Sequence, residues 1–507
     1  MNLDTKYFAK TKKDFSYNRW FKIVKVLFHS PSNDEKLKKI AFLLFLSFYC
    51  FTSIAQTFSK SQNFFPIAVT LQAPYNIEAY NKAGVNIYCD LSWGPLDAYH
   101  LDLLHKSNMY VICAQDSFAL TKLNDTLIYA WSLPYDEPDN AQWNPKTSDY
   151  DSCINPSVII GDYKKYKLKD PTRPVILGLG QGVANSTWYG RGSCYNWLAS
   201  YPKYLKGCDI GTFDIYPVNS NVVGITNNLW YVAKGMDSII AWSANSNKPM
   251  WTWIETTKIN TTSAGKPSPS QVKSEVWMAL IHGARGIGYF THSWNPNYVS
   301  GAVLLDTPMV SSITIINNQI RALASVLNSP NIIGYSTVSS NTAVPIDIMS
   351  KKYGGYNYIF SVAMRSGNTT ATFHVASGIS VEVIGENRSI TITGGQFSDN
   401  FSSYGVHLYK IKGSSTGFRN MNDGLENEIK VFPNPAKDKL NIQVLKNTIK
   451  ISKLILSNTI GQEILAIDQD EINMDNNTLN IKLLPEGIYI LSIETDNGII
   501  VKKVIKQ

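Results

Sequence analysis

Carboxylates stand at or near the ends of four apolar runs in this sequence, where an acidic side chain needs a partner or a function. Asp136 and Glu137 are adjacent and follow the run LIYAWSL, Glu255 ends PMWTWIE, and Asp214 and Asp90 belong to two further runs. Hydrolysis of a glycosidic bond needs two carboxyl groups flanking that bond, one as acid and one as base or nucleophile. These residues are therefore candidates for that chemistry, provided that the fold brings two of them together.

Eight short apolar, β-prone runs recur between residues 64 and 290, and stretches with helical spacing separate most of them. In one such stretch, 268–284, Val272, Val276 and Ala279 fall on one helical face. Strands alternating with helices at this length predict an α/β fold, a closed (β/α)₈ TIM barrel over 57–330, whose active site lies at the C-terminal strand ends. A doubly wound open sheet is the alternative, but no glycine-rich nucleotide turn follows the first run. The eight runs span 64–70, 85–90, 109–114, 127–133, 174–180, 208–218, 249–255 and 286–290.

The pattern changes after the last expected barrel helix, 311–328. Runs at 356–366, 370–377, 379–385 and 389–395 alternate with period two and are separated by glycine-bearing turns. This predicts a small all-β accessory domain over 331–411, followed by a polar linker over 412–428.

The C-terminal segment, 429–507, carries three motifs in a fixed order: Pro-Asn-Pro in VFPNPAKDKLNIQ (431–443), Leu-Pro-x-Gly-x-Tyr from residue 484, and a lysine-rich last strand. It resembles the β-sandwich C-terminal sorting domain of the type IX secretion system of Bacteroidota. The resemblance implies recognition by that secretion machinery and export through the outer membrane. The tail would then be removed, and the product released or attached at the cell surface.

The N-terminal residues 1–56 have the layout of a secretory signal. The segment KLKKIAFLLFLSFYCFTSIAQ (36–56) has a basic start, an apolar run and small residues near its end, with cleavage expected after Ala55. A transmembrane anchor is the alternative, but an uncharged run of about 16 residues is short for a full span. The 35 residues before the segment fit neither role, and one interpretation is that they precede the true start of the product.

The net charge of +8 is concentrated at the N-terminus. Residues 1–39 hold ten Lys and Arg against four Asp and Glu, a net of +6, which leaves +2 for the rest of the chain. The remainder has no basic stripe, so we expect no nucleic-acid partner. We also expect no stable membrane span after signal cleavage.

Five cysteines follow the expected cleavage site, and an odd count leaves at least one thiol without a disulfide. Cys153 and Cys194 fall in loop-like segments and are the favoured pair; the alternative is that all five are small packed hydrophobes. No metal-site spacing or phosphate-binding loop occurs, so we expect no cofactor. The five are Cys89, Cys113, Cys153, Cys194 and Cys208.

The expected barrel resembles the clan A glycoside hydrolases, which place an acid/base Glu after strand 4 and a nucleophilic Glu after strand 7. The segment VWMALIHGARGIGYFTHSW (276–294) is also similar to the passage from helix 7 to strand 8 in galactosidase-like members. The resemblance implies that Glu137 is the acid/base and Glu255 the nucleophile of a retaining mechanism. Asp136 replaces the Asn that usually precedes the acid/base. It could raise the pKa of Glu137, bind a hydroxyl group, cap a helix or itself act as the acid.

Aromatic and polar residues near the expected strand ends are typical of a sugar site, because sugar rings stack their C–H faces on aromatic rings. The stretch QGVANSTWYGRGSCYNW (181–197) is long, glycine-rich and aromatic, which indicates a substrate loop. Tyr216 also matches the strand 6 Tyr that hydrogen-bonds the nucleophile in many clan A enzymes. We expect the following residues to bind substrate: Asp90, Trp93, Asp136, Trp188, Asp214, Tyr216, Trp253, His292 and Trp294.

These features predict a secreted glycoside hydrolase that acts on a poly- or oligosaccharide with retention of configuration. The alternative is a non-catalytic surface protein that binds glycans through a degenerate barrel, in which Glu137 and Glu255 would not converge. A deacetylase or peptidase is disfavoured, because the sequence has neither a His-rich metal site nor a Gly-x-Ser-x-Gly elbow.

Overall fold

The computed structural model describes residues 61–507, and nearly all of these belong to one compact unit, Gln62–Gln507. The expected signal segment, Trp93, Asp136 and Cys194 lie outside the described residues. The description omits 92–93, 136, 189–197, 244–247, 413–428, 446–448, 459–462, 469–477 and 496–497.

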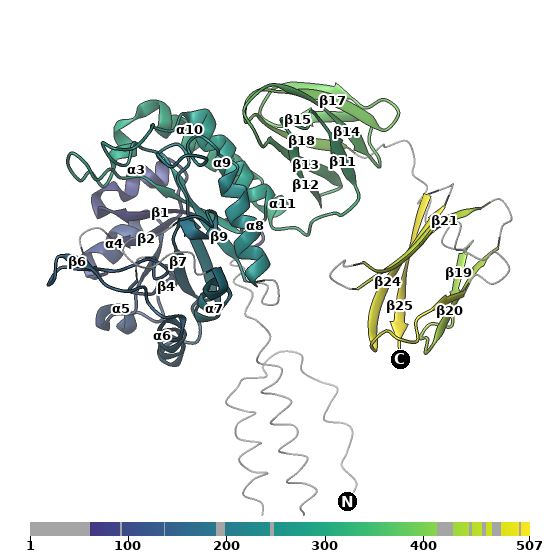
Figure 1. Ribbon diagram of the computed structural model, residues 1–507, viewed down its shortest axis with the longest axis horizontal. Helices are drawn as coiled ribbons and strands as arrows, with labels where there is room; N and C mark the ends of the chain where they lie inside the picture. The colour runs from purple at the N-terminus through teal and green to yellow at the C-terminus, as the bar shows by residue number, and fades with distance from the viewer. Residues whose placement is uncertain are drawn as a thin grey trace, which may run out of the picture. The chain divides into compact units, whose positions relative to one another are not determined.

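Eight parallel strands close into a barrel in the order β1-β10-β9-β8-β7-β4-β3-β2 (Figure 1), which confirms the predicted (β/α)₈ architecture. The barrel strands are β1 (Ile67–Gln72), β2 (Ile87–Leu91), β3 (Tyr110–Ala114), β4 (Ile128–Ser132), β7 (Val175–Leu179), β8 (Ile210–Asp214), β9 (Met250–Glu255) and β10 (Gly286–Phe290). The run predicted over 208–218 is shorter as a strand: β8 ends at Asp214, and the residues after it enter a loop.

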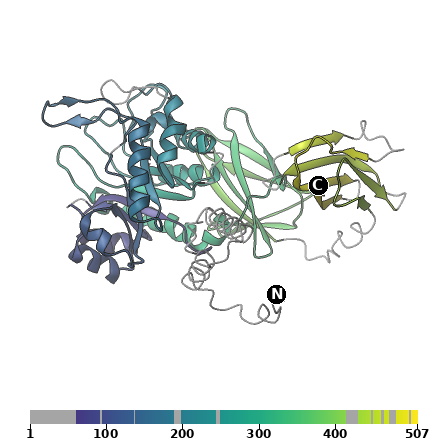
Figure 2. The same cartoon turned by 90° about the horizontal axis from the view of Figure 1, so that it is seen from below.

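Helices cover the outside of the barrel (Figure 1). They are α3 (Ile77–Lys82), α4 (Ala98–Lys106), α5 (Ser117–Thr121), α6 (Pro156–Lys169), α7 (Tyr201–Tyr204), α8 (Tyr231–Ser243), α9 (Pro269–Ile281), α10 (Thr307–Ala322) and α11 (Ala324–Leu327). Short 3₁₀ turns are η2 (Pro74–Asn76), η3 (Gln181–Val183), η4 (Leu198–Ser200), η5 (Leu205–Gly207) and η6 (Ala302–Leu305). A small hairpin of β5 (Trp143–Asn144) and β6 (Asp149–Tyr150) extends away from the barrel in Figures 1 and 2.

Large and small residues alternate inside the barrel. Trp251 and Trp253 on β9 pack into the interior cluster and pair in register with Gly286 and Gly288 on β10. A Cβ atom on either glycine would overlap the facing indole ring. The two glycines therefore provide the space that lets two tryptophans fill the barrel at close-packed density.

Helix α9 begins with a capping box, in which Ser268 and Gln271 bond each other's backbone, and has Pro269 in its first turn. The predicted apolar face is buried as expected, and Trp277, elsewhere on the helix, packs against Phe360 with ring centroids 5.2 Å apart. Because Phe360 belongs to the following β region, this helix contributes to both parts of the core.

Eight antiparallel strands follow the barrel and form two sheets, ordered β11-β14-β17 and β12-β13-β18-β15-β16. Their apolar faces enclose a separate cluster that includes Phe373, Phe397 and Tyr409. The predicted all-β region is thus confirmed as a fold. The strands are β11 (Ser336–Ser339), β12 (Ile346–Tyr353), β13 (Tyr356–Ala363), β14 (Thr369–Val375), β15 (Ser380–Val383), β16 (Arg388–Thr391), β17 (Gln396–Phe401) and β18 (Val406–Lys412).

Side chains from the barrel and the accessory sheets bond to one another. Ser274 Oγ donates to the Tyr404 carbonyl at 2.6 Å, and the Tyr404 hydroxyl donates to the Asn227 carbonyl at 2.9 Å. His282, at the end of α9, contacts Asp237 on α8 at 2.8 Å and Asp347 on β12 at 3.0 Å. These bonds attach the accessory sheets to helix α9 and to the loop that precedes α8.

The C-terminal strands form two antiparallel sheets, β19-β20-β23 and β22-β21-β24-β25, around their own apolar cluster. They are β19 (Ile429–Phe432), β20 (Lys439–Val444), β21 (Ile451–Asn458), β22 (Glu463–Asp468), β23 (Thr478–Asn480), β24 (Gly487–Thr495) and β25 (Gly498–Lys506). Within the described ranges, none of the helices combines the length and apolarity needed to cross a membrane.

Candidate functional site

A cavity of about 750 Å³ opens at the C-terminal ends of the barrel strands, the end where (β/α)₈ enzymes carry their active sites. Three carboxylates contribute to its wall from three different strands: Asp90 from β2, Glu137 after β4 and Asp214 from β8. Its other predicted lining residues are Trp188, Tyr216, Trp253, His292 and Trp294. Seven of the nine expected substrate-binding residues thus share one cavity, and the other two, Trp93 and Asp136, lie outside the described residues.

Glu137 is held in place by its neighbours. Its backbone has a φ of 46°, a left-handed conformation that is costly for a residue with a side chain and is typical of functional sites. Asn140 Nδ2 donates to Glu137 Oε2 at 2.5 Å, and Trp188 Nε1 donates to Asn140 Oδ1 at 3.2 Å. The orientation of the Glu137 carboxylate therefore depends on the Asn140 side-chain amide, which the Trp188 indole holds in place.

The turn that carries Glu137 is anchored to the next strand through Asp139. The Gly180 amide donates to both carboxylate oxygens of Asp139, at 2.9 and 3.2 Å, and the Tyr201 hydroxyl donates to Oδ2 at 2.9 Å. Gly180 has no room for a side chain, because a Cβ atom there would overlap Asn140 Nδ2 and lie 3.1 Å from Glu137 Oε2. The sequence therefore requires glycine at the point where β7 passes the Glu137 carboxylate.

Asp214 and Tyr216 form the part of the wall that follows β8. Burial raises the pKa of Tyr216 well above its usual range, and the negative charges of Asp214, Glu137 and Glu255 raise it further. The phenol is therefore protonated at neutral pH and hydrogen-bonds to Asp214. A hydroxyl close to two cavity carboxylates can orient one of them and stabilise its ionised form.

Asp90 is the third carboxylate, and its φ of 56° gives it the same strained backbone as Glu137. Ser132 Oγ donates to Asp90 Oδ1 at 2.7 Å, and Cys89 Sγ lies 3.9 Å from Oδ2. Burial raises the pKa of Asp90 to about 6, although both contacts oppose the shift. Asp90 is therefore mostly ionised at neutral pH, and its oxygens can accept hydrogen bonds from sugar hydroxyl groups.

His292 lies at the cavity wall among aromatic rings. Its ring centroid is 3.8 Å from that of Phe290 and 4.8 Å from that of Trp294. Burial lowers its pKa to about 4, so the imidazole is neutral at physiological pH. Neither ring nitrogen has a hydrogen-bond partner in the described structure. A neutral imidazole can donate one hydrogen bond and accept another, which suits recognition of a hydroxyl group.

Exposed aromatic rings occur at the cavity wall and, separately, on the β5–β6 hairpin. Trp294 is 44% exposed and stacks on Tyr298 with centroids 4.9 Å apart. Trp143 and Tyr150 on the β5–β6 hairpin also expose large rings and contact each other edge to face at 5.2 Å. Exposed rings near a polar cavity are suited to stacking against sugar rings.

Glu255, expected as the nucleophile, is not among the residues that line this cavity. It is fully buried, and its Oε1 accepts the Val218 amide at 2.6 Å. Its Oε2 accepts the Asn219 amide at 2.9 Å and the Asn219 side-chain amide at 2.5 Å. Three N–H donors thus occupy the carboxylate. The nucleophile role expected for Glu255 stays a prediction, and Asp214, which lines the cavity, is a second candidate for that role.

Sequence reasoning missed the residues that hold the carboxylates. Asn140, three residues after Glu137, positions that carboxylate, and Asn219 positions Glu255. Glu275 is fully buried in α9 beside Glu255. Asn140 could have been found in the sequence, because a helix-like turn after Pro138 brings it back to Glu137; the long-range contacts of Asn219 had no local signal.

The cysteines in the described ranges include three that are free and buried: Cys89, Cys113 and Cys208. Cys89 and Cys113 belong to neighbouring barrel strands and pack as small apolar residues. The favoured Cys153–Cys194 pair stays a prediction, because Cys194 lies outside the described residues.

The barrel and its cavity define the class: a (β/α)₈ protein with a carboxylate-containing site at the strand C-terminal ends, followed by antiparallel sheets. Residues 430–507 match the family model of the secretion system C-terminal sorting domain. The chain therefore carries a sorting domain, and the protein is secreted or located at the cell surface.

Solved glycoside hydrolases are similar to this chain in overall structure at low identity. An α-amylase from Geobacillus thermoleovorans complexed with acarbose is 10% identical with a TM-score of 0.42, covering 70% of this chain and 99% of the amylase. A GH30 endoxylanase from Clostridium papyrosolvens is 12% identical with a TM-score of 0.38, covering 69% and 96%. A family 39 glycoside hydrolase from Bacteroides cellulosilyticus is 11% identical with a TM-score of 0.39, covering 69% and 82%. A comparison with curated proteins gives no match.

Proposed function

We propose that the protein is a secreted glycoside hydrolase that cleaves a poly- or oligosaccharide in the barrel cavity. The observation that carries the proposal is the shared cavity of Glu137 and Asp214, with Tyr216 beside both and aromatic rings at the border. Two carboxyl groups in one cavity meet the requirement for glycosidic cleavage. Aromatic rings and uncharged polar groups supply the surface that a sugar chain needs.

In the proposed mechanism Asp214 attacks the anomeric carbon while Glu137 donates its proton to the leaving glycosidic oxygen. The bond from the anomeric carbon to that oxygen breaks, and a glycosyl ester forms on Asp214. Glu137, now ionised, takes a proton from a water molecule, whose oxygen attacks the anomeric carbon and releases Asp214. The sugar leaves with its original configuration, as expected for a retaining enzyme. Tyr216 would orient Asp214 for the attack.

The neighbouring residues would bind the substrate. Asp90 and His292 are placed to contact hydroxyl groups, since one accepts hydrogen bonds and the other is a neutral ring with two unbonded nitrogens. Trp188, Trp253 and Trp294 would stack against sugar rings at successive positions in the cavity. The described lining holds no lysine or arginine, so this proposal favours an uncharged glycan.

The deciding experiment measures release of reducing ends from a panel of polysaccharides by the wild type, Glu137→Gln, Asp214→Asn and Glu255→Gln. We expect Glu137→Gln and Asp214→Asn each to lower kcat by about 10²–10⁴-fold without a change in melting temperature. Glu255→Gln should retain much more activity than Asp214→Asn. The opposite ranking would restore Glu255 as the nucleophile.

Two further outcomes test the reaction class. NMR of the first product should show the anomeric configuration of the substrate. An inverted product would show that Asp214 acts as a general base on water rather than as a nucleophile. A wild-type protein that binds a polysaccharide firmly but releases no reducing ends from any of them would refute the hydrolase and support the non-catalytic glycan-binding alternative.

A further inference from the structure

Two carboxyl groups lie close together in the interior behind the cavity wall. Glu255 on β9 and Glu275 on α9 are both fully buried. Neither oxygen of Glu275 has an N–H or hydroxyl partner in the described structure, and the carboxyl group of Glu255 is close enough to raise the pKa of Glu275. Besides burial, the pKa of Glu275 responds to the charge and the side chain of Glu255.

A hydrogen bond between two carboxyl groups requires one proton, because two ionised carboxylates have no donor and repel each other. Glu255 is the better site for the negative charge, since it accepts hydrogen bonds from two backbone amides and from Asn219 Nδ2. Glu275 has only Glu255 as partner, so Glu275 should hold the proton. Burial, and then the charge of Glu255, raise the pKa of Glu275 well above its usual range.

The bonds made by Glu255 reach the wall of the proposed active site. Val218 and Asn219 belong to the loop that follows Tyr216, and the next residues of that loop line the cavity. Asn219 also donates to the Thr257 carbonyl at 2.9 Å and accepts the Ile259 amide at 2.8 Å. Glu255 and Asn219 together therefore join the loop after β8 to the loop after β9.

We propose that Glu255 and Glu275 form a proton-sharing carboxyl pair that locks the loop after β8, so that Glu255 is a positioning residue for Asp214 and Tyr216. Glu275 supplies the proton that lets a second carboxyl group approach the charged Glu255 without repulsion. Glu255 in turn holds the loop amides of Val218 and Asn219. The catalytic consequence rests on the proposed hydrolase function, whereas the pair and the lock do not.

The pair is tested by infrared spectroscopy and hydrogen exchange on the full-length protein. At neutral pH the wild type should show the carbonyl band of a protonated, buried carboxylic acid. Glu275→Gln should remove that band yet keep slow exchange of the Val218 and Asn219 amides, because the Gln side-chain amide still donates to Glu255. Glu382→Gln, which replaces an exposed glutamate on β15, is the matched control and should change neither signal.

Glu255→Gln should instead keep the acid band and speed exchange of the two loop amides by about tenfold or more, since the new amide group faces N–H donors. If the wild-type spectrum has no acid band, or if Glu275→Gln does not remove the band, the proposed shared proton is wrong. Unchanged amide exchange in Glu255→Gln would overturn the lock. Both readouts remain valid if no glycan is cleaved.

Activity distinguishes positioning from direct catalysis. If a cleaved glycan is found, Glu255→Gln should lower kcat/KM by about 10–100-fold with KM also changed, because misplaced groups bind and react less well. The kcat/KM of Glu275→Gln should stay near the wild-type value, and the kcat/KM of Glu275→Leu should fall toward that of Glu255→Gln. Complete loss of kcat in Glu255→Gln with unchanged amide exchange would overturn the positioning role and assign Glu255 to the chemistry.

Discussion

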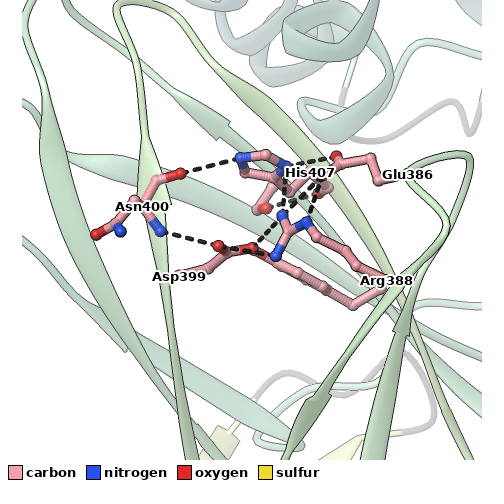
Figure 3. A network of polar contacts seen from close by, with 7 residues as sticks. Glu386, Arg388, Asp399, Asn400 and His407 are labelled. Carbon is pink, nitrogen blue, oxygen red and sulfur yellow. Dashed lines mark hydrogen bonds and ion pairs between the residues drawn. The ribbon is translucent and has the colours of Figure 1, made fainter.

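The barrel cavity and the accessory sheets both contain several carboxylates, but the partners of these carboxylates differ. In the accessory sheets, Arg388 on β16 makes two hydrogen bonds to Asp399, at 3.0 and 2.7 Å, and a third to Glu386 at 2.8 Å (Figure 3). His407 contacts Glu386 at 2.5 Å and the Asn400 carbonyl at 3.1 Å. Each acidic group there has a cationic or N–H partner.

The cavity carboxylates Asp90, Glu137 and Asp214 lie in a wall whose described residues include no lysine or arginine. There the backbone is strained at Asp90 and Glu137, and burial raises the pKa of Asp90 to about 6. In the accessory network the hydrogen bonds from Arg388 to Asp399 raise the pKa of Arg388 and favour its charged form. The comparison teaches that a paired charge network fixes two sheets together, whereas carboxylates in a wall without lysine or arginine retain the capacity to exchange protons with a ligand.

Among changes that remove no catalytic carboxyl group, the largest effect should come from Gly180→Ala in the cavity. The added Cβ would overlap Asn140 Nδ2 and push it, together with the Glu137 carboxylate, out of position. A displacement of about 1 Å can cost about 100-fold in rate, so we expect a loss of this size in glycan cleavage with a small change in melting temperature.

The matched control is Gly161→Ala on helix α6, where a Cβ atom would meet nothing within 4 Å. This change should leave the rate unaltered and slightly stabilise the helix, because alanine is the better helix former. Equal rates for Gly180→Ala and Gly161→Ala would show that the Asn140–Glu137 contact has no part in the reaction.

A smaller effect, on stability alone, should follow from Arg388→Met in the accessory network. The substitution leaves Asp399 and Glu386 without their shared cation, and Arg388 is about one-third exposed, so solvent softens the loss. We expect the free energy of unfolding to fall by about 1–2 kcal/mol in chemical denaturation, with unchanged kcat. A variant with wild-type stability would show that the network makes no net contribution to the free energy of unfolding. A variant with lost activity would show that the accessory network also affects the cavity.

The barrel could be predicted from the sequence, because the eight apolar runs and their spacing reflect directly which segments are buried. Every run overlaps a barrel strand, and three carboxylates at or near the strand ends, Asp90, Glu137 and Asp214, reach one cavity. That convergence follows from topology: parallel strands of a barrel end on the same side, so residues far apart in sequence become neighbours.

The sequence cannot decide whether Asp214 or Glu255 is the second catalytic carboxylate. Trp251 and Trp253 face the barrel interior, and strict alternation along β9 predicts the same for Glu255. The side chain of Glu255 instead bonds to Val218 and Asn219 at the end of the strand, where the loop after β8 offers two backbone amides. Such long-range amide contacts leave no periodic signal, so a buried structural glutamate and a nucleophile look alike in sequence.

The smallest expected effect concerns the contact between the two regions, at His282. Burial pulls the pKa of His282 down, but Asp237 and Asp347 outweigh it and raise the pKa to about 9 from an ordinary value of 6.5. A raised folded-state pKa means that the contact stabilises fully below pH 6.5 and is lost as the pH rises through about 9. Because both aspartates are more than one-third exposed, we expect about 1 kcal/mol at most. The melting temperatures of wild type and His282→Gln should therefore differ at pH 6 and converge by pH 10. Asp347→Asn, which removes one of the two carboxylates, should lie between them at pH 6. A difference that stays constant with pH would show that His282 stabilises by packing rather than by charge.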